Sequence, residues 1–170
     1  KKSSDTAQNL VMLAKKKIQE IANKDGLSGV SSGFEKLDSL TSGWQPSDLI
    51  IIAARPGMGK TALTLSMARN MTVTHLTPVA FFSLEMSSVQ LITRLISAET
   101  GLSSEKLRTG RLADHEWKQL NVKVGDLEKA PLFIDDTPAL SIFDLRAKAR
   151  RLASQHGIKL IIVDYLQLMT

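Results

Sequence analysis

One short run of residues has the composition of a phosphate-binding loop. It reads ARPGMGKT over residues 54–61 and fits the pattern G-x-x-x-x-G-K-[ST], except that alanine stands in the first position. Gly57 and Gly59 let the loop curl so that successive backbone N–H groups point at an anion, and a helix that begins after them adds the positive end of its dipole. The run therefore predicts a site for the triphosphate of ATP or a similar nucleotide. The residues expected to line it are Arg55, Pro56, Gly57, Met58, Gly59, Lys60, Thr61 and Ala62.

Lys60 and Thr61 have separate tasks in a loop of this kind. The Lys60 ammonium reaches the β- and γ-phosphates, and the Thr61 hydroxyl contacts Mg²⁺. Mg²⁺ binds largely through water and phosphate oxygens, so it needs few protein ligands. The sequence therefore predicts ATP and Mg²⁺ as the cofactors.

A metal–nucleotide site also needs an acid at the end of a neighbouring strand. Asp164 follows the apolar run Leu160-Ile161-Ile162-Val163, which is the Walker B pattern, and it is expected to orient the water shell of the metal. A strand that ends in aspartate often caps the following turn instead. Together with the phosphate-binding loop, the pattern favours the metal site, with Thr61 and Asp164 as its protein ligands.

Glu85 stands directly after the apolar run 79–84. Ligands of open α/β sheets bind at the carboxyl ends of the strands, so a carboxylate there suits a group that polarises the attacking water. The residues alone leave a second interpretation open, in which Glu85 is a helix-capping acid near Ser87. Asp135-Asp136-Thr137-Pro138 ends another apolar run, and turn formation explains it adequately.

A different nucleotide fold competes for the same loop. Residues 57–62 also fit G-x-G-x-x-[GA], and Glu85 could then be the ribose-binding acid of an oxidoreductase. Two observations oppose this alternative: Arg55 and Pro56 lengthen a turn that the dinucleotide fold keeps tight, and the Lys-Thr pair has no role there.

Short apolar runs alternate with longer helical segments, which is typical of a parallel sheet covered by helices on both faces. The predicted strands are 49–54, 79–84, 132–135 and 159–164. Each is almost continuously apolar, as strands buried on both faces require. The predicted helices are 60–74, 87–99, 114–127 and 141–156. Ser87…Gln90 and Ser141…Asp144 are expected to open the second and fourth of them, with Gly101 and Gly157 after their ends.

The N-terminal segment differs from the rest of the chain. Residues 6–24 place Leu10, Ala14, Ile18 and Ile21 at helical spacing, and turn-forming residues follow at 25–29. We therefore predict a linker helix and flexible linker over residues 1–29 and an α/β core over 30–170. The apolar stripe needs a cover, either its own domain or a neighbouring subunit.

Composition narrows the class of protein. The 170 residues include no cysteine, which fits a reducing, cytoplasmic setting, and no apolar run approaches the about 18 residues that span a bilayer. Six lysines against two acids within residues 1–24 supply four of the five excess positive charges. A solvated helix face explains such a lysine run, and contact with DNA is the alternative.

With these residues in hand, the chain resembles the motor domain of DnaB-type replicative DNA helicases, which are RecA-like P-loop ATPases. The resemblance spans residues 31–169 and is carried by SGFEKLD at 32–38, AARPGMGKT at 53–61, FSLEMS at 82–87, LRTG at 107–110, FIDDTP at 133–138 and DYLQL at 164–168. It implies that Lys60 and Thr61 hold phosphate and Mg²⁺, that Glu85 activates water and that Asp164 is the Walker B acid. Arg94 falls where the family has an arginine near the catalytic glutamate, and a solvent-facing helix arginine is its alternative.

The resemblance also implies partners and an activity. The linker helix is expected to dock on the adjacent subunit of a hexameric ring, which unwinds DNA in the 5′→3′ direction as it hydrolyses ATP. Single-stranded DNA, primase and a helicase loader are the implied partners of the full-length protein. The family's sensor residue, arginine finger and DNA-binding loops have no counterpart up to Thr170. Loss of an arginine finger lowers turnover roughly 10³- to 10⁵-fold, so the 170 residues alone are expected to hydrolyse ATP poorly.

Two other functions compete with this one. The first is a RecA-like nucleotide-binding module for assembly or loading, without unwinding activity. The second is a small-molecule kinase, which lacks support because no arginine-rich lid segment follows the helix after the loop.

Overall fold

The structure is a computed structural model that describes residues 4–24 and 26–170. Lys1, Lys2 and Asp25, which belong to the predicted lysine-rich helix and linker, lie outside the described residues. The contacts divide the chain into two compact units, Lys1–Ile50 and Ile51–Thr170. The predicted domain boundary after residue 29 stays a prediction.

The first unit contains the predicted N-terminal helix, α1 (Ala7–Ala22). Thr6 caps it, because the Thr6 hydroxyl accepts a hydrogen bond from the Asn9 N–H at 3.3 Å. None of its residues is buried, and the Leu10 and Ile18 side chains are 53% and 65% exposed. Within the described residues of its own unit, Leu10 and Ile18 of the apolar stripe stay exposed and Ile21 is half-buried.

The rest of the first unit is a short helix, α2 (Glu35–Thr41), followed by a closed loop. Val30 and Trp44 form an antiparallel bridge, with N–H to C=O distances of 2.8 and 2.7 Å. A side chain at Gly29 would place its Cβ 2.4 Å from the Trp44 carbonyl oxygen, so only glycine fits there. Sequence patterning did not predict α2, which is only seven residues long.

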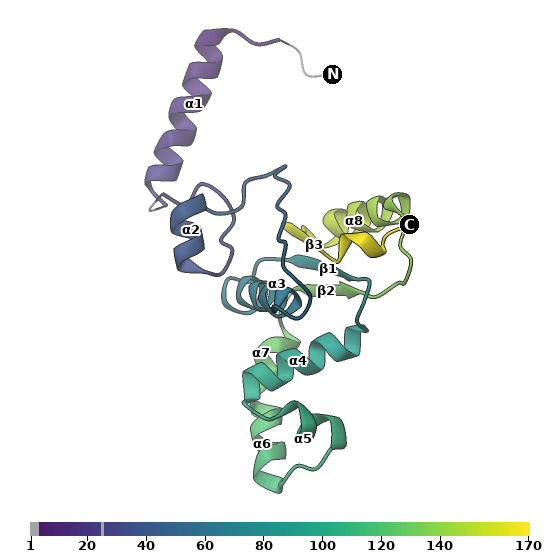
Figure 1. Cartoon of the computed structure of the whole chain (residues 1–170). Helices are drawn as coiled ribbons and strands as arrows, with labels where there is room; N and C mark the ends of the chain where they lie inside the picture. The colour runs from purple at the N-terminus through teal and green to yellow at the C-terminus, as the bar shows by residue number, and fades with distance from the viewer. Residues whose placement is uncertain (1–3, 25) are drawn as a thin grey trace. The chain divides into compact units, whose positions relative to one another are not determined.

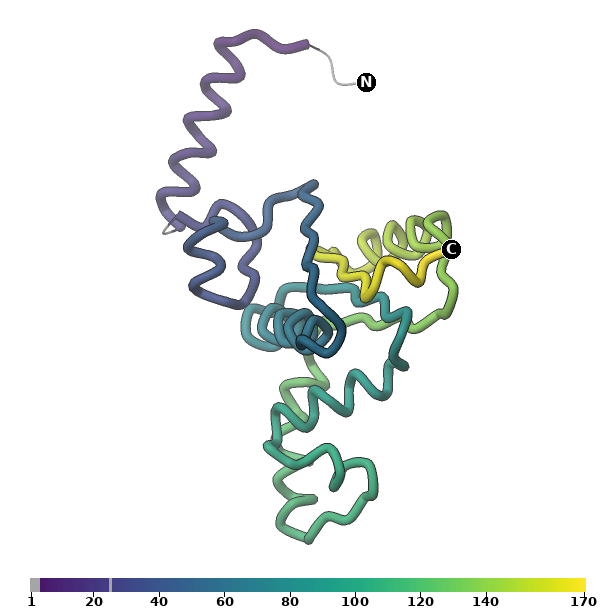
Figure 2. Tube along the Cα trace, in the orientation of Figure 1, coloured from purple at the N-terminus to yellow at the C-terminus, as the bar shows by residue number. Residues whose placement is uncertain are grey.

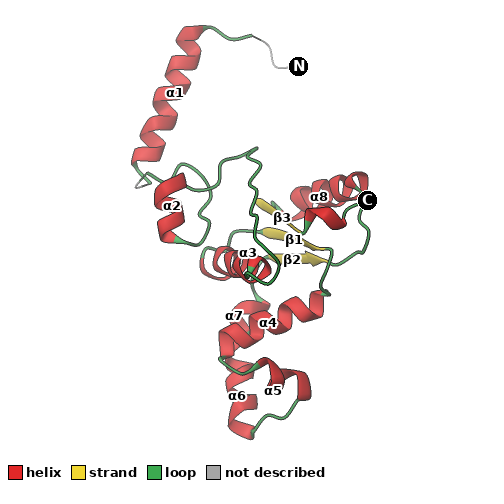
Figure 3. Cartoon of the chain, in the orientation of Figure 1, coloured by secondary structure: helices red, strands yellow, loops and turns green. Residues whose placement is uncertain are grey.

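The second unit is built on a three-stranded parallel sheet, β1 (Val79–Ser83), β2 (Leu132–Asp135) and β3 (Leu160–Asp164), in the order β2-β1-β3 (Figures 1 and 3). Phe82 lies opposite Asp135, and Ser83 lies opposite Asp164. The carboxyl ends of the strands therefore meet at one edge. These strands confirm three of the four predicted runs and the predicted α/β class.

The core lies on both faces of β1. Ala80 and Phe82 pack with Leu140 and with Leu145 and Leu152 of α8 (Ile142–His156). Alternate residues of a strand point to opposite faces, so the remaining β1 side chains point away from α8. All five β1 residues are buried, which means that both faces of the strand are covered.

The helical segments of this unit begin after the loop, and the last of them follows β3 (Figure 2). They are α3 (Lys60–Arg69) with a π-helical continuation at Asn70–Thr74, α4 (Ser88–Thr100), α5 (Ser104–Thr109), α6 (Asp114–Lys123), α7 (Gly125–Glu128), α8 and a 3-10 turn at Leu166–Leu168. Ser87 with Gln90 caps α4 and Ser141 caps α8, as predicted. The helix predicted over 114–127 is interrupted at Val124, and α5 was not predicted.

The predicted strand over residues 49–54 is wrong. This segment forms neither a strand nor a bridge, and the Leu49 and Ile51 side chains are 87% and 79% exposed. Its apolar composition suits a buried strand, but a strand exists only where a neighbour satisfies its N–H and C=O groups. Among the described residues the sheet consists of β1, β2 and β3, and residues 49–54 pair with none of them.

The helices were also compared with the length and apolar composition of a bilayer-spanning helix. Within the described residues, no helix combines the length and the apolar character that a bilayer-spanning segment needs.

Candidate nucleotide-binding site

The predicted phosphate-binding loop is exposed and is shaped by its two glycines. Residues 53–59 are all exposed, and Gly57 and Gly59 have φ angles of +75° and +85°. A Cβ at either position would meet nothing within 4 Å, so the backbone conformation, and not space, requires glycine there. Gly59 is also the N-cap of α3, which has no side-chain hydrogen bond at that end. An uncapped helix N-terminus leaves N–H groups directed at the loop, where they can bind an anion.

The fold brings the two predicted metal ligands together. The Thr61 hydroxyl lies 2.7 Å from Asp164 Oδ2, although 103 residues separate them in the chain. Asp164 is only 4% exposed, so this carboxylate is held at the buried end of β3. Two oxygen ligands from two elements form the kind of hard-donor corner that Mg²⁺ accepts, with water and phosphate oxygens completing its shell. Among the described residues, no group of three or more His, Asp or Glu side chains forms a metal cage.

Lys60 lies beside the same carboxylate. Its Nζ is 3.9 Å from Asp164 Oδ1 and 4.2 Å from the centroid of the Tyr165 ring. The side chain is 29% exposed, so its ammonium group is partly desolvated between an anion and an aromatic face. Tyr165 was not singled out from the sequence, because a lone aromatic after a strand carries no chemical signature.

Glu85 reaches the same edge of the sheet from β1. The Leu84 N–H donates to the Asp164 carbonyl oxygen at 2.8 Å, and Glu85 stands two residues beyond Ser83, the last residue of β1. Glu85 is exposed. The cap of α4 is formed by Ser87 and Gln90, so the helix-capping role considered for Glu85 is filled by another residue. Its role in activating water stays a prediction.

Arg94 lies farther along, in the middle of α4, and is exposed. Within the described chain it makes no ion pair with an acidic residue. The structure therefore does not join Arg94 to the corner formed by Lys60, Thr61 and Asp164, and its catalytic role also stays a prediction.

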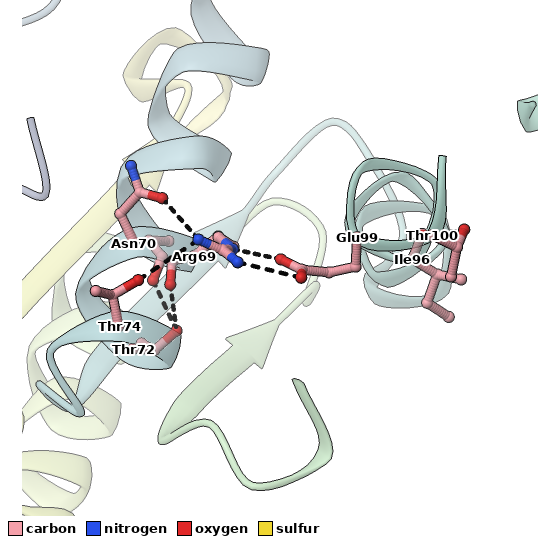
Figure 4. A network of polar contacts seen from close by, with 8 residues as sticks. Arg69, Asn70, Thr72, Thr74, Ile96, Glu99 and Thr100 are labelled. Atoms are coloured by element: carbon pink, nitrogen blue, oxygen red, sulfur yellow. Dashed lines mark hydrogen bonds and ion pairs between the residues drawn. The ribbon is translucent and has the colours of Figure 1, made fainter. Parts of the chain in front are cut away.

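A second ion pair links α3, the helix after the loop, to α4, the helix after Glu85. Arg69 of α3 points at Glu99 of α4, and its Nε and Nη2 donate to the two carboxylate oxygens, the latter at 3.1 Å (Figure 4). The hydrogen bond to Glu99 raises the pKa of Arg69, although burial opposes the shift. Figure 4 also shows Asn70, whose side-chain oxygen accepts from Arg69 Nη1 at 3.2 Å. Arg69 and Glu99 lie in the last turns of α3 and α4, outside the sequence motifs, so no motif indicated the pair.

The predicted turn after β2 exists, and its two aspartates also make hydrogen bonds outside the turn. Asp135 accepts from the Thr137 N–H at 3.0 Å, as an aspartate turn requires, and from Lys148 Nζ at 2.6 Å. Asp136 accepts from the Ser88 N–H, the first of α4, at 2.7 Å. Sequence reasoning treated both residues as turn formers and missed the contact between Asp136 and α4.

The fold and this corner define the class of protein: an α/β nucleotide-binding protein of the P-loop, RecA-like kind. The family model described as DnaB-like helicase C-terminal domain matches residues 29–170. The chain belongs to that family. Membership disfavours the dinucleotide-binding alternative, which has no place for the Lys-Thr pair.

Curated relatives agree with the family match. The chain is 46% identical over 153 residues to the replicative DNA helicase DnaB of Geobacillus stearothermophilus, covering 89% of this chain and 34% of the relative. It is 47% identical over 156 residues to the corresponding helicase of a Nostoc species, covering 89% of this chain and 18% of that protein. The chain thus spans about a third or less of the curated relatives it matches.

Solved structures support the same assignment. A structure described as an ATPase domain superposes with a TM-score of 0.86 at 31% identity, covering 98% of this chain and 60% of the other. A DnaB-like replicative helicase, described together with its interactions with primase, superposes with a TM-score of 0.80 at 32% identity, covering 99% of this chain and 40% of the other.

Proposed function

We propose that this chain is the ATP-binding and ATP-hydrolysing motor part of a hexameric replicative DNA helicase that moves 5′→3′ along single-stranded DNA. The observation that carries the proposal is the corner at the carboxyl edge of the sheet. There the Thr61 hydroxyl and Asp164 lie 2.7 Å apart beside Lys60, below a loop whose glycines open toward solvent. Family membership supports the choice of a helicase over other P-loop proteins.

Each group of the corner has a separate task. The N–H groups of residues 57–61 cradle the phosphate chain, and Lys60 neutralises charge on its β- and γ-phosphates. Thr61 and Asp164 hold the metal and its waters. When bound, Mg²⁺ shares the phosphate charge and so makes the terminal phosphorus easier to attack. Glu85, two residues beyond the end of β1, accepts a proton from the attacking water.

Assembly into a ring is proposed through α1. Its Leu10 and Ile18 side chains are more than half exposed, and no residue of α1 is buried. Exposed apolar surface of this kind is typical of a subunit contact. A ring would also let a neighbouring subunit supply charge to the site, as arginine fingers do in related enzymes. We further propose that the full-length protein binds primase, since the DnaB-like structure that this chain resembles is described with primase, and a helicase loader.

The test uses the full-length protein. Wild type is expected to hydrolyse ATP with Mg²⁺ and to separate a forked DNA duplex. Lys60→Ala is expected to lose nucleotide binding or hydrolysis. Glu85→Ala is expected to bind nucleotide normally and to lose turnover by roughly 10²- to 10⁴-fold, the range for a lost general base. Glu105→Ala, an exposed glutamate on α5, is the matched control and should behave as wild type.

Two results would contradict the proposal. ATP hydrolysis by the full-length ring without any strand separation would favour the assembly or loading module. Normal turnover in Glu85→Ala would remove Glu85 from the mechanism while leaving the phosphate site in place.

A further inference from the structure

The loop between β1 and α4, residues 84–87, carries Glu85 and is held mainly by hydrogen bonds to its ends. At the β1 end, the Ser83 hydroxyl donates to the Met86 carbonyl at 2.6 Å and accepts from the Met86 N–H at 3.2 Å. At the α4 end, Ser87 and Gln90 exchange hydrogen bonds of 3.0 and 3.2 Å. Glu85 itself is exposed and makes no hydrogen bond or ion pair with the described residues. Its position therefore depends on these anchors.

One further anchor comes from a distant part of the chain. Asp136 Oδ2 accepts from the Ser88 N–H at 2.7 Å, across 48 residues of sequence. Asp136 is placed there by the sheet, because it follows β2, whose Asp135 lies opposite Phe82 of β1. A carboxylate on the first N–H of a helix makes a charge-assisted hydrogen bond and also faces the positive end of the helix dipole.

Asp135, the neighbouring acid, has different partners, so the contact with α4 belongs to Asp136 alone of the two. Asp135 turns to Lys148 Nζ at 2.6 Å and to the Thr137 N–H at 3.0 Å, so it takes no part in holding α4. The hydrogen bond from the Ser88 N–H lowers the pKa of Asp136. At neutral pH the carboxylate is ionised, as an ordinary aspartate is. The start of α4 is thus held by a fixed negative charge that belongs to the next strand of the sheet.

We propose that Asp136 is a positioning residue for Glu85, which it orients by anchoring the N-terminus of α4 to the end of β2. The proposal rests on the function proposed above. Without the anchor, the Ser87–Gln90 capping box remains, but the tie between α4 and the end of β2 is lost and the 84–87 loop gains freedom. A catalytic group displaced by about 1 Å loses on the order of 10²-fold in rate, whereas the phosphate site on α3 and β3 keeps its geometry. Asp136 therefore affects turnover and not nucleotide affinity.

The experiment compares variants of the full-length protein. Asp136→Ala is expected to lower kcat for ATP roughly tenfold to a hundredfold, with KM and the dissociation constant for ADP unchanged. Asp136→Asn retains an oxygen that can accept from the Ser88 N–H and should recover most of the turnover. Asp144→Ala is the matched control, because Asp144 makes a comparable hydrogen bond with Ser141 at the start of α8. It should leave kcat unchanged.

Two further readouts separate positioning from a loss of fold. Amide hydrogen exchange over residues 84–90 should rise in Asp136→Ala and stay normal in Asp144→Ala. On a Glu85→Ala background, Asp136→Ala should cause no additional loss of turnover, because both changes remove the same contribution. Full additivity of the two changes would overturn the proposal.

Three other results would overturn the positioning role of Asp136, and one of them would also overturn the proposed function. Unchanged kcat in Asp136→Ala beside an active wild type would overturn the positioning role alone. Equal inactivity of the Ala and Asn variants, with unfolding midpoints lowered alike, would overturn it in favour of a purely structural role. A wild type that hydrolyses no ATP would overturn both this proposal and the proposed function.

Discussion

Replacing Glu99 by alanine tests the ion pair that joins the helix after the phosphate-binding loop to the helix after Glu85. The pair combines two hydrogen bonds between charged groups, from Arg69 Nε and Nη2 to the two Glu99 oxygens. Glu99 is 15% exposed and Arg69 is 32% exposed. The pair is therefore intermediate between a surface ion pair and a fully buried one.

The intermediate burial sets the loss in the free energy of unfolding that we expect for Glu99→Ala. A hydrogen bond to a charged group contributes about 1.5–3 kcal/mol when buried, and an exposed pair contributes about 0–1 kcal/mol. After Glu99→Ala, Arg69 remains a third exposed and keeps its hydrogen bond to Asn70, so water compensates part of the loss. We expect the free energy of unfolding to fall by about 2 kcal/mol, between these limits. Arg69→Met should cost more, because it leaves the less exposed carboxylate without its partner.

Chemical unfolding by urea, followed by circular dichroism, measures these changes. Glu105→Ala is the control and should lie within about 0.5 kcal/mol of wild type, as an exposed substitution does. The double variant Arg69→Met/Glu99→Ala should cost less than the sum of the single changes, because both remove the same pair. An unfolding free energy for Glu99→Ala equal to that of Glu105→Ala, or full additivity in the double variant, would refute the reasoning.

Two further predictions concern the loop and the turn after β2. Gly59→Ala is expected to destabilise the protein by about 1–2 kcal/mol, the cost of a left-handed conformation for a residue with a Cβ; since nothing lies within 4 Å of that Cβ, a full urea curve that matches wild type would contradict the conformational argument. The second prediction is a pH dependence at Asp135. Burial opposes its ionisation, but hydrogen bonds from Lys148 and Thr137 outweigh this and lower its pKa. A lowered folded-state pKa stabilises the protein at pH values above the unfolded-state pKa of about 4. This stabilisation is lost as the pH falls from that value through the folded-state pKa. The stability difference between wild type and Asp135→Asn should therefore be constant near neutral pH and shrink below about pH 4; a difference that grows on acidification would exclude this account.

Local chemistry in the sequence predicted the parts of the site that lie in one segment. The positive φ angles of Gly57 and Gly59 and the start of α3 at Lys60 all follow from residues adjacent in the chain. The same holds for the caps of α4 and α8, because a cap involves residues only three positions apart. Apolar runs also predicted β1, β2 and β3, but the expected burial on both faces holds only for β1, since Ile161 of β3 is 43% exposed.

Contacts between distant segments were decided by the tertiary structure. Residues 49–54 have the composition of a buried strand, yet they form none, because a strand depends on a partner that composition does not reveal. The Thr61–Asp164 and Asp136–Ser88 contacts span 103 and 48 residues, and they arise only once the sheet has set the strands in the order β2-β1-β3. The sequence by itself thus predicted which residues are candidates for binding phosphate. The pairing of strands, through hydrogen bonds that any backbone can make, determined which acids stand beside them.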